Sequence, residues 1–492
     1  MNGVRSPGSA DRRQMVRKVL KGAGFRTGSV ITSRLLTVVR IIVFARLFTP
    51  DTVGTAAIAL AAVTFAFAFA DFGFLENVIR RHPLRRDNAN TAFTMSLLAG
   101  AVVFAVVFVS APLVSELLSQ DVTTYIRFLA IFVLTIPLTF PLVYWESALD
   151  FEHPAAALVI REFIALAAAI AVQLIFSLGV WSILIGYVGG LGAQAAYIWL
   201  LASQRPSLAV HAKYRREGLS FGVPYMFQSV NRQVASRADF LMVGAFNGPT
   251  QVGYYSVAWN VPLMLGSLAT AIDTMLLPVF ARFDSSRQEL ASLFNRANKM
   301  WSVIGSFCCF PLIVFPAEIV EIVFGSTWEP AAPLLRVMSI AFLIRFCTGY
   351  AYDNLVLVRG RTKYMMKWGF VNTLLVFSLG LFMIREYGPI GGAWFWVIQA
   401  SVLGPLVRLP LIWDELRTLQ FVRHVWQPVA AGLIAVAGAS GAVSLLGDGA
   451  AGMAAAAVVY VSLYASILPV VDRSLTADLK RMIALARSKE PA

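Results

Sequence analysis

The chain has 492 residues, of which 58% are hydrophobic and only 14% are charged. Soluble domains carry roughly 25% charged residues, and a soluble protein of this size could not bury so much apolar surface in its core. The composition therefore excludes an ordinary soluble enzyme and indicates a membrane protein, in which the bilayer surrounds the apolar side chains. The formal charge of +14 lies in short clusters between hydrophobic segments, so we expect no nucleic acid as a partner.

Hydrophobic stretches follow one another along nearly the whole chain. A helix needs about 20 apolar residues to cross the hydrocarbon core, and these stretches have that length. We therefore predict an all-α integral membrane protein with about fourteen transmembrane helices. The predicted spans are 28–48, 53–77, 91–114, 124–145, 155–177, 180–202, 222–246, 252–279, 299–316, 333–357, 366–385, 389–412, 428–446 and 450–471.

Lysine and arginine gather in every second gap between these spans, and the opposite gaps are acidic or neutral. Because cytoplasmic loops of membrane proteins are enriched in basic residues, we expect both termini in the cytoplasm and an even number of spans. The basic N-terminal tail is also suited to contact anionic lipid headgroups. The basic gaps are the tail before residue 28, the regions 80–86, 205–216, 282–299, 359–367, 417–423 and 473–489, and the single residue Arg161.

The chain also resembles itself at an offset of about 200 residues, as repeated halves of transporters do. Residues 111–118 parallel 316–323, and residues 127–131 parallel 336–340. Copies separated by six spans start on the same side of the membrane, so they predict two parallel six-helix repeats around a central cavity. The expected parts are a cytoplasmic tail 1–27, an N-lobe 28–203, a linker 204–221, a C-lobe 222–413, two appended C-terminal helices in 414–471 and a cytoplasmic tail 472–492.

Several polar and charged residues lie deep inside the predicted spans. An arginine near the bilayer centre costs roughly 2.5–3.5 kcal/mol, so deep arginines call for a specific environment. On the first span the polar side chains form a narrow stripe, and on the seventh span, its repeat partner, they again share a face. The candidate cavity residues are Ser33, Arg34, Thr37, Arg40, Gln228, Arg232, Ser236, Arg237 and Arg345.

These residues favour a cavity with a positive field that attracts an anionic headgroup. Arginine suits phosphate because its planar guanidinium donates paired hydrogen bonds. The alternative is a set of interhelical ion pairs that hold the two halves together. Asp71, Asp239 and Asp273 are candidates for ion coupling or for pairing between the lobes.

The chain lacks the sequence patterns of an enzyme or of a metal site. Its three cysteines, Cys308, Cys309 and Cys347, lie in apolar stretches without the spacing of a disulfide framework or of metal ligands. There is no phosphate loop, zinc spacing or nucleophile elbow. We therefore expect no catalytic residue, no metal and no cofactor. The predicted outer loops are also short for a catalytic domain.

Three motifs lie at the ends of predicted spans: FARLFTPDTVG from Phe44 to Gly54, ADFGF from Ala70 to Phe74, and FGSTWEPAAPLL from Phe324 to Leu335. Together they resemble the bacterial polysaccharide transporters, the Wzx-like oligosaccharide flippases of the multidrug/oligosaccharidyl-lipid/polysaccharide exporter superfamily.

The resemblance implies that an undecaprenyl-diphosphate-linked oligosaccharide, such as a repeat unit of exopolysaccharide, O-antigen or capsule, is flipped across the bacterial inner membrane. It also implies ion-coupled alternating access, and polymerase and chain-length components of the export pathway as partners. Two alternatives stay open within the same superfamily: a flippase for the peptidoglycan precursor lipid and a drug exporter. A membrane polysaccharide polymerase is the enzyme alternative.

Overall fold

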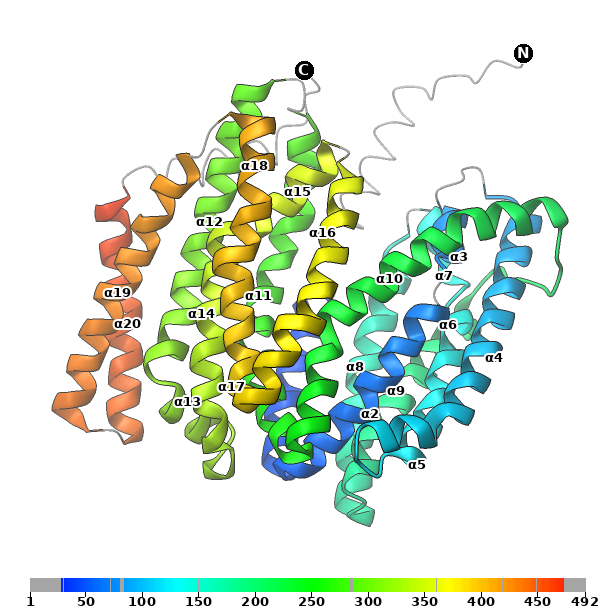
Figure 1. The fold of residues 1–492 in the computed structure, drawn as a ribbon, viewed down its shortest axis with the longest axis horizontal. Coiled ribbons are helices and arrows are strands. Elements are labelled where there is room, and N and C mark those ends of the chain that lie inside the picture. Colours follow the sequence, from blue (N-terminus) through cyan, green and yellow to red (C-terminus); the bar gives the residue numbers. More distant parts are fainter. Residues whose placement is uncertain are drawn as a thin grey trace. The chain divides into compact units, whose positions relative to one another are not determined.

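The computed structural model describes residues 28–29, 31–70, 72–79, 84–148, 150–282, 286–359, 361–417, 420–447 and 449–472. Within these ranges the regular elements are all helical (Figure 1). Ten helical stretches of the described chain are long and apolar enough to cross a membrane. The protein is therefore an all-helical, multi-pass membrane protein, which confirms the predicted fold class at this level. The count of fourteen spans and the repeat arrangement stay predictions.

The helices form two compact units. Unit 1 contains the described residues up to Phe44 together with Thr52–Ala245, and unit 2 contains Ala45–Asp51 together with the described residues from Phe246 onward. The short segment Ala45–Asp51, which includes the last residues of the first helix, therefore packs with the C-terminal half of the chain.

Unit 1 begins with the helix of the first predicted span, which covers residues 31–47. The predicted span 124–145 is not one regular helix, because prolines at 137 and 141 lack the backbone N–H that continues a helical ladder. The other elements are α2 (Pro50–Ala70), α3 (Phe74–Ile79), α4 (Arg86–Leu117), α5 (Thr123–Ala130), η1 (Ile131–Leu134), α6 (Thr135–Leu138), α7 (Leu142–Ser147), α8 (Glu152–Phe176), α9 (Val180–Leu201) and α10 (Ala212–Asn247).

Helix α10 begins at Ala212, well before the predicted start of the seventh span at 222. The preceding segment lies along α4, held by hydrogen bonds from α4 side chains. Thr91 accepts from the backbone N–H of His211 at 3.0 Å, and Asn90 accepts from the N–H of Ser207 at 2.9 Å. Part of the predicted linker 204–221 is therefore an ordered strap followed by helix.

Helices α8 and α9 approach closely through glycine. A Cβ atom added at Gly186 would lie 2.5 Å from the carbonyl oxygen of Ala165, and one added at Gly190 would lie 2.5 Å from that of Arg161. Two glycines four residues apart leave one side of α9 without side chains, which is a common way for membrane helices to pack. This contact positions Arg161 and its neighbours against α9.

We expect Gly186→Val to loosen the α8–α9 pair. The added side chain meets backbone atoms that cannot move aside, and such overpacking costs about 1–3 kcal/mol. The measurement is the thermal unfolding midpoint of the purified protein in detergent. Gly192→Val is the matched control, because a Cβ at Gly192 has no neighbour within 4 Å and the change in helix propensity is the same. Equal midpoints for the two variants would contradict the packing argument.

Unit 2 contains a long apolar stretch, Met366–Leu416, that is interrupted at Gly388. Gly388 adopts φ 67° and ψ −152°, a conformation that favours glycine and breaks the helical ladder. The elements of unit 2 are α11 (Pro249–Arg282), α12 (Arg287–Val314), α13 (Pro316–Val323), η2 (Ser326–Ala331), α14 (Ala332–Thr348), α15 (Tyr350–Val358), α16 (Thr362–Leu375), η3 (Val376–Gly380), α17 (Leu381–Ile398), η4 (Gln399–Leu403), α18 (Gly404–Leu416), α19 (Gln420–Leu446) and α20 (Ala450–Val471).

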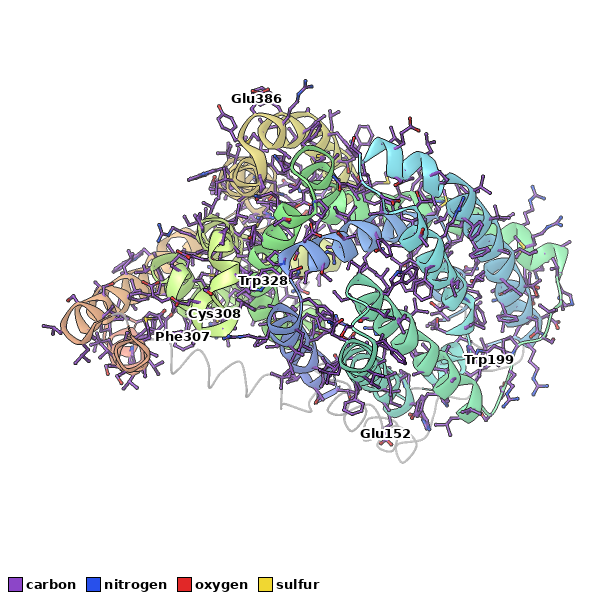
Figure 2. The ribbon with its side chains drawn as sticks, turned by 90° about the horizontal axis from the view of Figure 1, so that it is seen from below. Glu152, Trp199, Phe307, Cys308, Trp328 and Glu386 are labelled. Carbon is purple, nitrogen blue, oxygen red and sulfur yellow. The ribbon has the colours of Figure 1, made fainter. Side chains whose placement is uncertain are left out.

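The last two helices, α19 and α20, form a hairpin that packs on α12 (Figure 1). The hydroxyl of Tyr460 on α20 donates to the backbone carbonyl of Phe307 on α12 at 2.9 Å. Phe307 lies next to the hairpin (Figure 2). At the end of α20, Asp472 forms an ion pair with Lys299, and their side chains are 3% and 4% exposed. Lys299 was expected in a basic cytoplasmic gap, yet it is buried because α12 begins earlier than the predicted span 299–316.

Candidate functional site

A buried carboxylate in α8 brings together several charged side chains of unit 1. Glu162 is 7% exposed. Its Oε2 lies 2.9 Å from a guanidinium nitrogen of Arg40 and accepts a hydrogen bond from the Thr37 hydroxyl at 3.4 Å. Its Oε1 accepts from Arg161 at 2.8 Å. We call Thr37, Arg40, Arg161 and Glu162 the charge cluster.

The local sequence explains how the charge cluster forms. Thr37 and Arg40 are three residues apart on the first helix, so they share a face and reach the same carboxylate. Arg161 and Glu162 are adjacent on α8, and Arg161 donates from both Nε and Nη2 to its neighbour. Two guanidinium groups around one carboxylate leave a formal net charge of +1. The carboxylate fixes both cations, and each keeps further N–H donors.

The pairing bears on the two interpretations of the deep arginines. Arg40 is in an ion pair, as the alternative interpretation requires, but the pair joins two helices of unit 1. The side chain of Arg40 is still 21% exposed, and that of Arg161 is 35% exposed. The cluster is therefore a positive site with restricted access, and Arg40 does not stand alone in it.

The other candidates on the first helix differ in their environment. Arg34 is exposed, and the Ser33 carbonyl accepts a hydrogen bond from the Thr37 hydroxyl at 2.9 Å. Ser33 and Thr37 therefore contact each other within the helix. Arg345 lies in α14 of unit 2 and is exposed.

On α10 the predicted polar face is split between exposed and buried positions. Gln228 and Arg232 are exposed, and Arg232 donates to the Ser229 hydroxyl at 3.3 Å. Asp239 is buried, and its carboxylate accepts from the backbone N–H of Phe240 at 3.0 Å. The Ser236 hydroxyl donates to the Gln233 carbonyl at 3.2 Å. The guanidinium carbon of Arg237 lies 5.2 Å from the centroid of the Phe240 ring.

Two acidic candidates cannot be placed. Asp71 lies outside the described residues, and Asp273 lies in α11 with its side chain outside them. No group of three or more His, Cys, Asp or Glu side chains in the described part of the chain is arranged to hold a metal ion. The three cysteines are free thiols, two of them buried.

Sequence reasoning missed two residues of the charge cluster. Arg161 was assigned to a basic gap, and Glu162 was not considered, although both lie inside the predicted span 155–177. The signal was present, since adjacent charges of opposite sign in an apolar stretch are expensive unless they find partners. Arg408, which is not among the candidate residues, is also buried in α18 and donates to the Thr348 hydroxyl at 3.4 Å.

A pocket of about 280 Å³ lies inside unit 1 and extends to Arg161. Its walls are mostly apolar and include six aromatic rings, and a few polar side chains from different helices converge on it. That combination is typical of small-molecule sites. The lining residues are Phe67, Ala70, Phe72, Phe74, Leu75, Glu76, Ser96, Phe132, Thr135, Ile136, Thr139, Phe140, Leu142, Arg161, Tyr187, Leu191 and Gln194.

The ADFGF motif forms one wall of this pocket. The rings of Phe72 and Phe74 stack with centroids 5.5 Å apart. Between them Gly73 adopts φ 61°, and a Cβ there would lie 2.6 Å from the ring of Tyr225 on α10. The Tyr225 hydroxyl donates to Glu76 Oε1 at 3.1 Å. Glycine is required at 73 because both the turn and the neighbouring ring exclude a side chain.

The other two motifs meet each other within unit 2. Arg46 Nε donates to the carbonyl of Val323 at the end of α13 at 3.0 Å, and another of its nitrogens donates to the carbonyl of Ile322. The indole N–H of Trp328 donates to the carbonyl of Ala45 at 2.7 Å, and Trp328 is 1% exposed (Figure 2). These contacts hold the segment Ala45–Asp51 on unit 2.

Residues 43–333 match the family described as "Polysaccharide biosynthesis protein", more than half of the chain. The chain belongs to the polysaccharide biosynthesis protein family. The suspected resemblance is therefore confirmed, and all three motifs lie within or at the edge of the matched region.

Two curated relatives have names that agree with this family. The chain is 20% identical over 394 residues to the teichuronic acid biosynthesis protein TuaB of Bacillus subtilis. The aligned region covers 79% of this chain and 81% of TuaB. It is 23% identical over 433 residues to the lipopolysaccharide biosynthesis protein WzxC of Escherichia coli, with 84% and 85% covered. The similarity therefore extends well beyond the three motifs.

Among solved structures, the fold is similar to that of the lipid II flippase MurJ in an inward closed conformation. The TM-score is 0.76 at 15% identity, with 92% of this chain and 99% of that chain covered. At this identity the likeness concerns the fold. This member of the polysaccharide biosynthesis protein family thus shares the fold of the lipid II flippase MurJ.

Proposed function

We propose that the protein flips an undecaprenyl-diphosphate-linked oligosaccharide from the cytoplasmic to the outer leaflet of the bacterial inner membrane. The charge cluster is the observation that carries this proposal. A diphosphate needs cations at fixed positions, and Arg40 and Arg161 are both oriented by Glu162 while they keep further N–H donors. A neutral drug would gain nothing from such a site, and a cationic drug would be repelled.

Glu162 also gives the site a way to release its substrate. The carboxylate competes with phosphate for the same two guanidinium groups, so the anion is bound firmly enough to enter and weakly enough to leave. We propose that alternating access uses this competition and that Asp71, Asp239 and Asp273 are candidates for the coupling ion. Ser33, Arg34, Gln228, Arg232, Ser236, Arg237 and Arg345 stay candidates for further substrate contacts.

We also propose the fourteen-span topology with both termini in the cytoplasm. The stretch Met366–Leu416 has 51 residues. At about 1.5 Å per residue an unbroken helix of that length would far exceed the roughly 30 Å hydrocarbon core. The break at Gly388 therefore favours two crossings, at 366–385 and 389–412. The lobes 28–203 and 222–413, the linker, the two tails and the appended spans in 414–471 belong to the same proposal.

The test is genetic. A strain that lacks this gene should stop exporting its polymer and should accumulate lipid-linked oligosaccharide, and the wild-type gene should restore export. We propose that the protein works with the polymerase and chain-length components of the export pathway, so their loss alone should not prevent flipping. If single repeat units instead reach the outer face of the membrane in the deletion strain but are not joined into polymer, the protein is a polymerase. That result would contradict the proposal.

Arg40→Ala and Arg232→Ala should each abolish polymer export while the protein still inserts in the membrane. Arg40 belongs to the charge cluster, and Arg232 has an exposed side chain on α10, the helix that we predict to be the repeat partner of the first helix. Export is measured as surface polymer, and insertion as the amount of full-length protein in membranes. Arg385→Ala is the control, because Arg385 is exposed at the turn before Gly388. Normal export from both variants would contradict the assignment of these residues.

The peptidoglycan-precursor lipid is the second candidate substrate. The fold likeness to the lipid II flippase favours it, because the likeness covers 92% of this chain. Both substrates carry a sugar on an undecaprenyl diphosphate, so the charge cluster fits either of them. Growth of a strain depleted of its peptidoglycan-precursor flippase, when it expresses this protein, would favour the second candidate. Failure to grow, together with restored polymer export in the deletion strain, supports the first.

A further inference from the structure

We propose that the pocket of unit 1 binds the sugar ring that is bonded directly to the diphosphate of the substrate. This inference rests on the proposed function and adds a site for the glycan. In such a substrate the first sugar and the diphosphate are joined by one glycosyl-phosphate bond. A binding site for that sugar must therefore adjoin the binding site for the diphosphate.

Arg161 supplies this adjacency. Its Nε and Nη2 hold Glu162 in the charge cluster, and the same side chain lines the pocket. A diphosphate at the charge cluster would therefore place its first sugar at the mouth of the pocket. The volume of about 280 Å³ is slightly below the range of typical small-molecule sites, which begins at roughly 300 Å³. It fits a single ring and is too small for a whole oligosaccharide.

The lining has the two features that recognise a sugar. Phe72 and Phe74 form a stacked pair, and Phe67 stacks on Phe132 with centroids 4.7 Å apart. Aromatic faces carry partial negative charge, which attracts the C–H hydrogens on one side of a sugar ring. Hydroxyl groups at the rim of the ring then need hydrogen-bond acceptors and donors from the walls.

Glu76 is the acceptor that this arrangement predicts. Its Oε1 accepts from Tyr225, while Oε2 is buried without a hydrogen-bond partner among the described residues. A buried carboxylate oxygen without a partner is expensive, and a ligand hydroxyl would relieve that penalty. Gln194 on α9 offers an amide with both donor and acceptor atoms in the same pocket.

An organic cation is the competing occupant, because a carboxylate among aromatic rings also suits cations. Arg161 argues against it, since a guanidinium in the lining repels a cation and donates hydrogen bonds to sugar oxygens. The binding of a sugar and of a cation to the wild type and to the same pocket variants distinguishes the two occupants.

The test measures binding to the full-length protein in lipid nanodiscs by saturation-transfer NMR. The probes are methyl glycosides of glucose, galactose, mannose and N-acetylglucosamine, with tetraphenylphosphonium as the cationic probe. We expect at least one glycoside to bind saturably. Glu76→Gln should weaken it about tenfold, as the loss of a hydrogen bond to a charged group does. Phe72→Leu should weaken it by a similar factor, because it removes an aromatic face from the pocket. Phe163→Leu is the control, because Phe163 is exposed on α8 outside the pocket.

Three outcomes would overturn the sugar site: no glycoside binds, a glycoside binds equally to Glu76→Gln and Phe72→Leu, or only tetraphenylphosphonium binds and depends on Glu76. Polymer export in cells separates this result from the proposed function. Export by the wild type without glycoside binding overturns the sugar site alone, whereas glycoside binding without any export or flipping overturns the proposed function.

Discussion

Glu162→Gln should both destabilise the protein and abolish polymer export. The change leaves Arg40 and Arg161 close together without the carboxylate that compensates them. Removal of one partner from a fully buried pair costs about 3–5 kcal/mol. Because both arginines keep partial access to solvent, we expect about 2 kcal/mol. The measurements are the thermal unfolding midpoint in detergent and surface polymer in cells.

A double variant separates stability from function at this position. Arg40→Gln combined with Glu162→Gln removes one charge of each sign, so the unfolding midpoint should recover most of the loss, as coupled residues do in a double-mutant cycle. Export should stay absent, because a phosphate-binding cation is missing. Glu116→Gln, at an exposed position near the end of α4, is the control for the loss of a carboxylate. If the stability loss of the double variant equals the sum of the losses of the two single variants, Arg40 and Glu162 do not pair directly.

Trp328→Ala should produce the largest loss of stability in unit 2. The indole is 1% exposed, and truncation of a buried tryptophan costs about 3–5 kcal/mol. The Ala45 carbonyl also loses its donor. Trp328→Phe keeps most of the volume and loses the hydrogen bond, so it should cost about 1 kcal/mol. Thermal unfolding of the purified variants gives the comparison.

The control for this series is Trp394→Ala, which truncates an exposed tryptophan on α17 of the same unit. It should leave the unfolding midpoint nearly unchanged. If Trp328→Ala and Trp394→Ala unfold at the same temperature, the contact between the two motifs does not stabilise unit 2.

The sequence predicts the helical class well because each span carries its own signal. A run of about 20 apolar residues is recognisable without knowledge of the other helices that it packs against. The same is true of the polar stripe that places Thr37 and Arg40 on one face of the first helix. The irregular region 124–145 is harder to predict from the sequence. Its prolines are visible, but the sequence does not say whether a membrane helix bends at a proline or breaks into short turns.

The partners of the charged residues were not predictable in the same way. Arg161 looked like a loop residue because its role was judged from the alternation of charged gaps. Lys299 was misjudged for the same reason, since its partner Asp472 lies far away in the chain. Periodicity reports the face on which a side chain lies and contains no information on which distant residue meets it.

The motifs show the same limit. Their residues were recognised as a pattern, but the reasons for the pattern lie in long-range contacts. Gly73 is needed because of the Tyr225 ring, and Arg46 because of the carbonyls of α13. The pocket beside Glu76 arises from several separate elements of unit 1, so only the folded chain reveals it.

Transbilayer movement of the substrate tests the central claim most directly. The purified protein is reconstituted in liposomes that contain an undecaprenyl-diphosphate-linked sugar with a fluorescent label, and an impermeant quencher reports the leaflet in which the label lies. Wild-type protein should make the whole label pool accessible, whereas Arg40→Gln/Arg161→Gln should leave the inner half protected. Wild-type protein that moves no more label than protein-free liposomes would contradict the account.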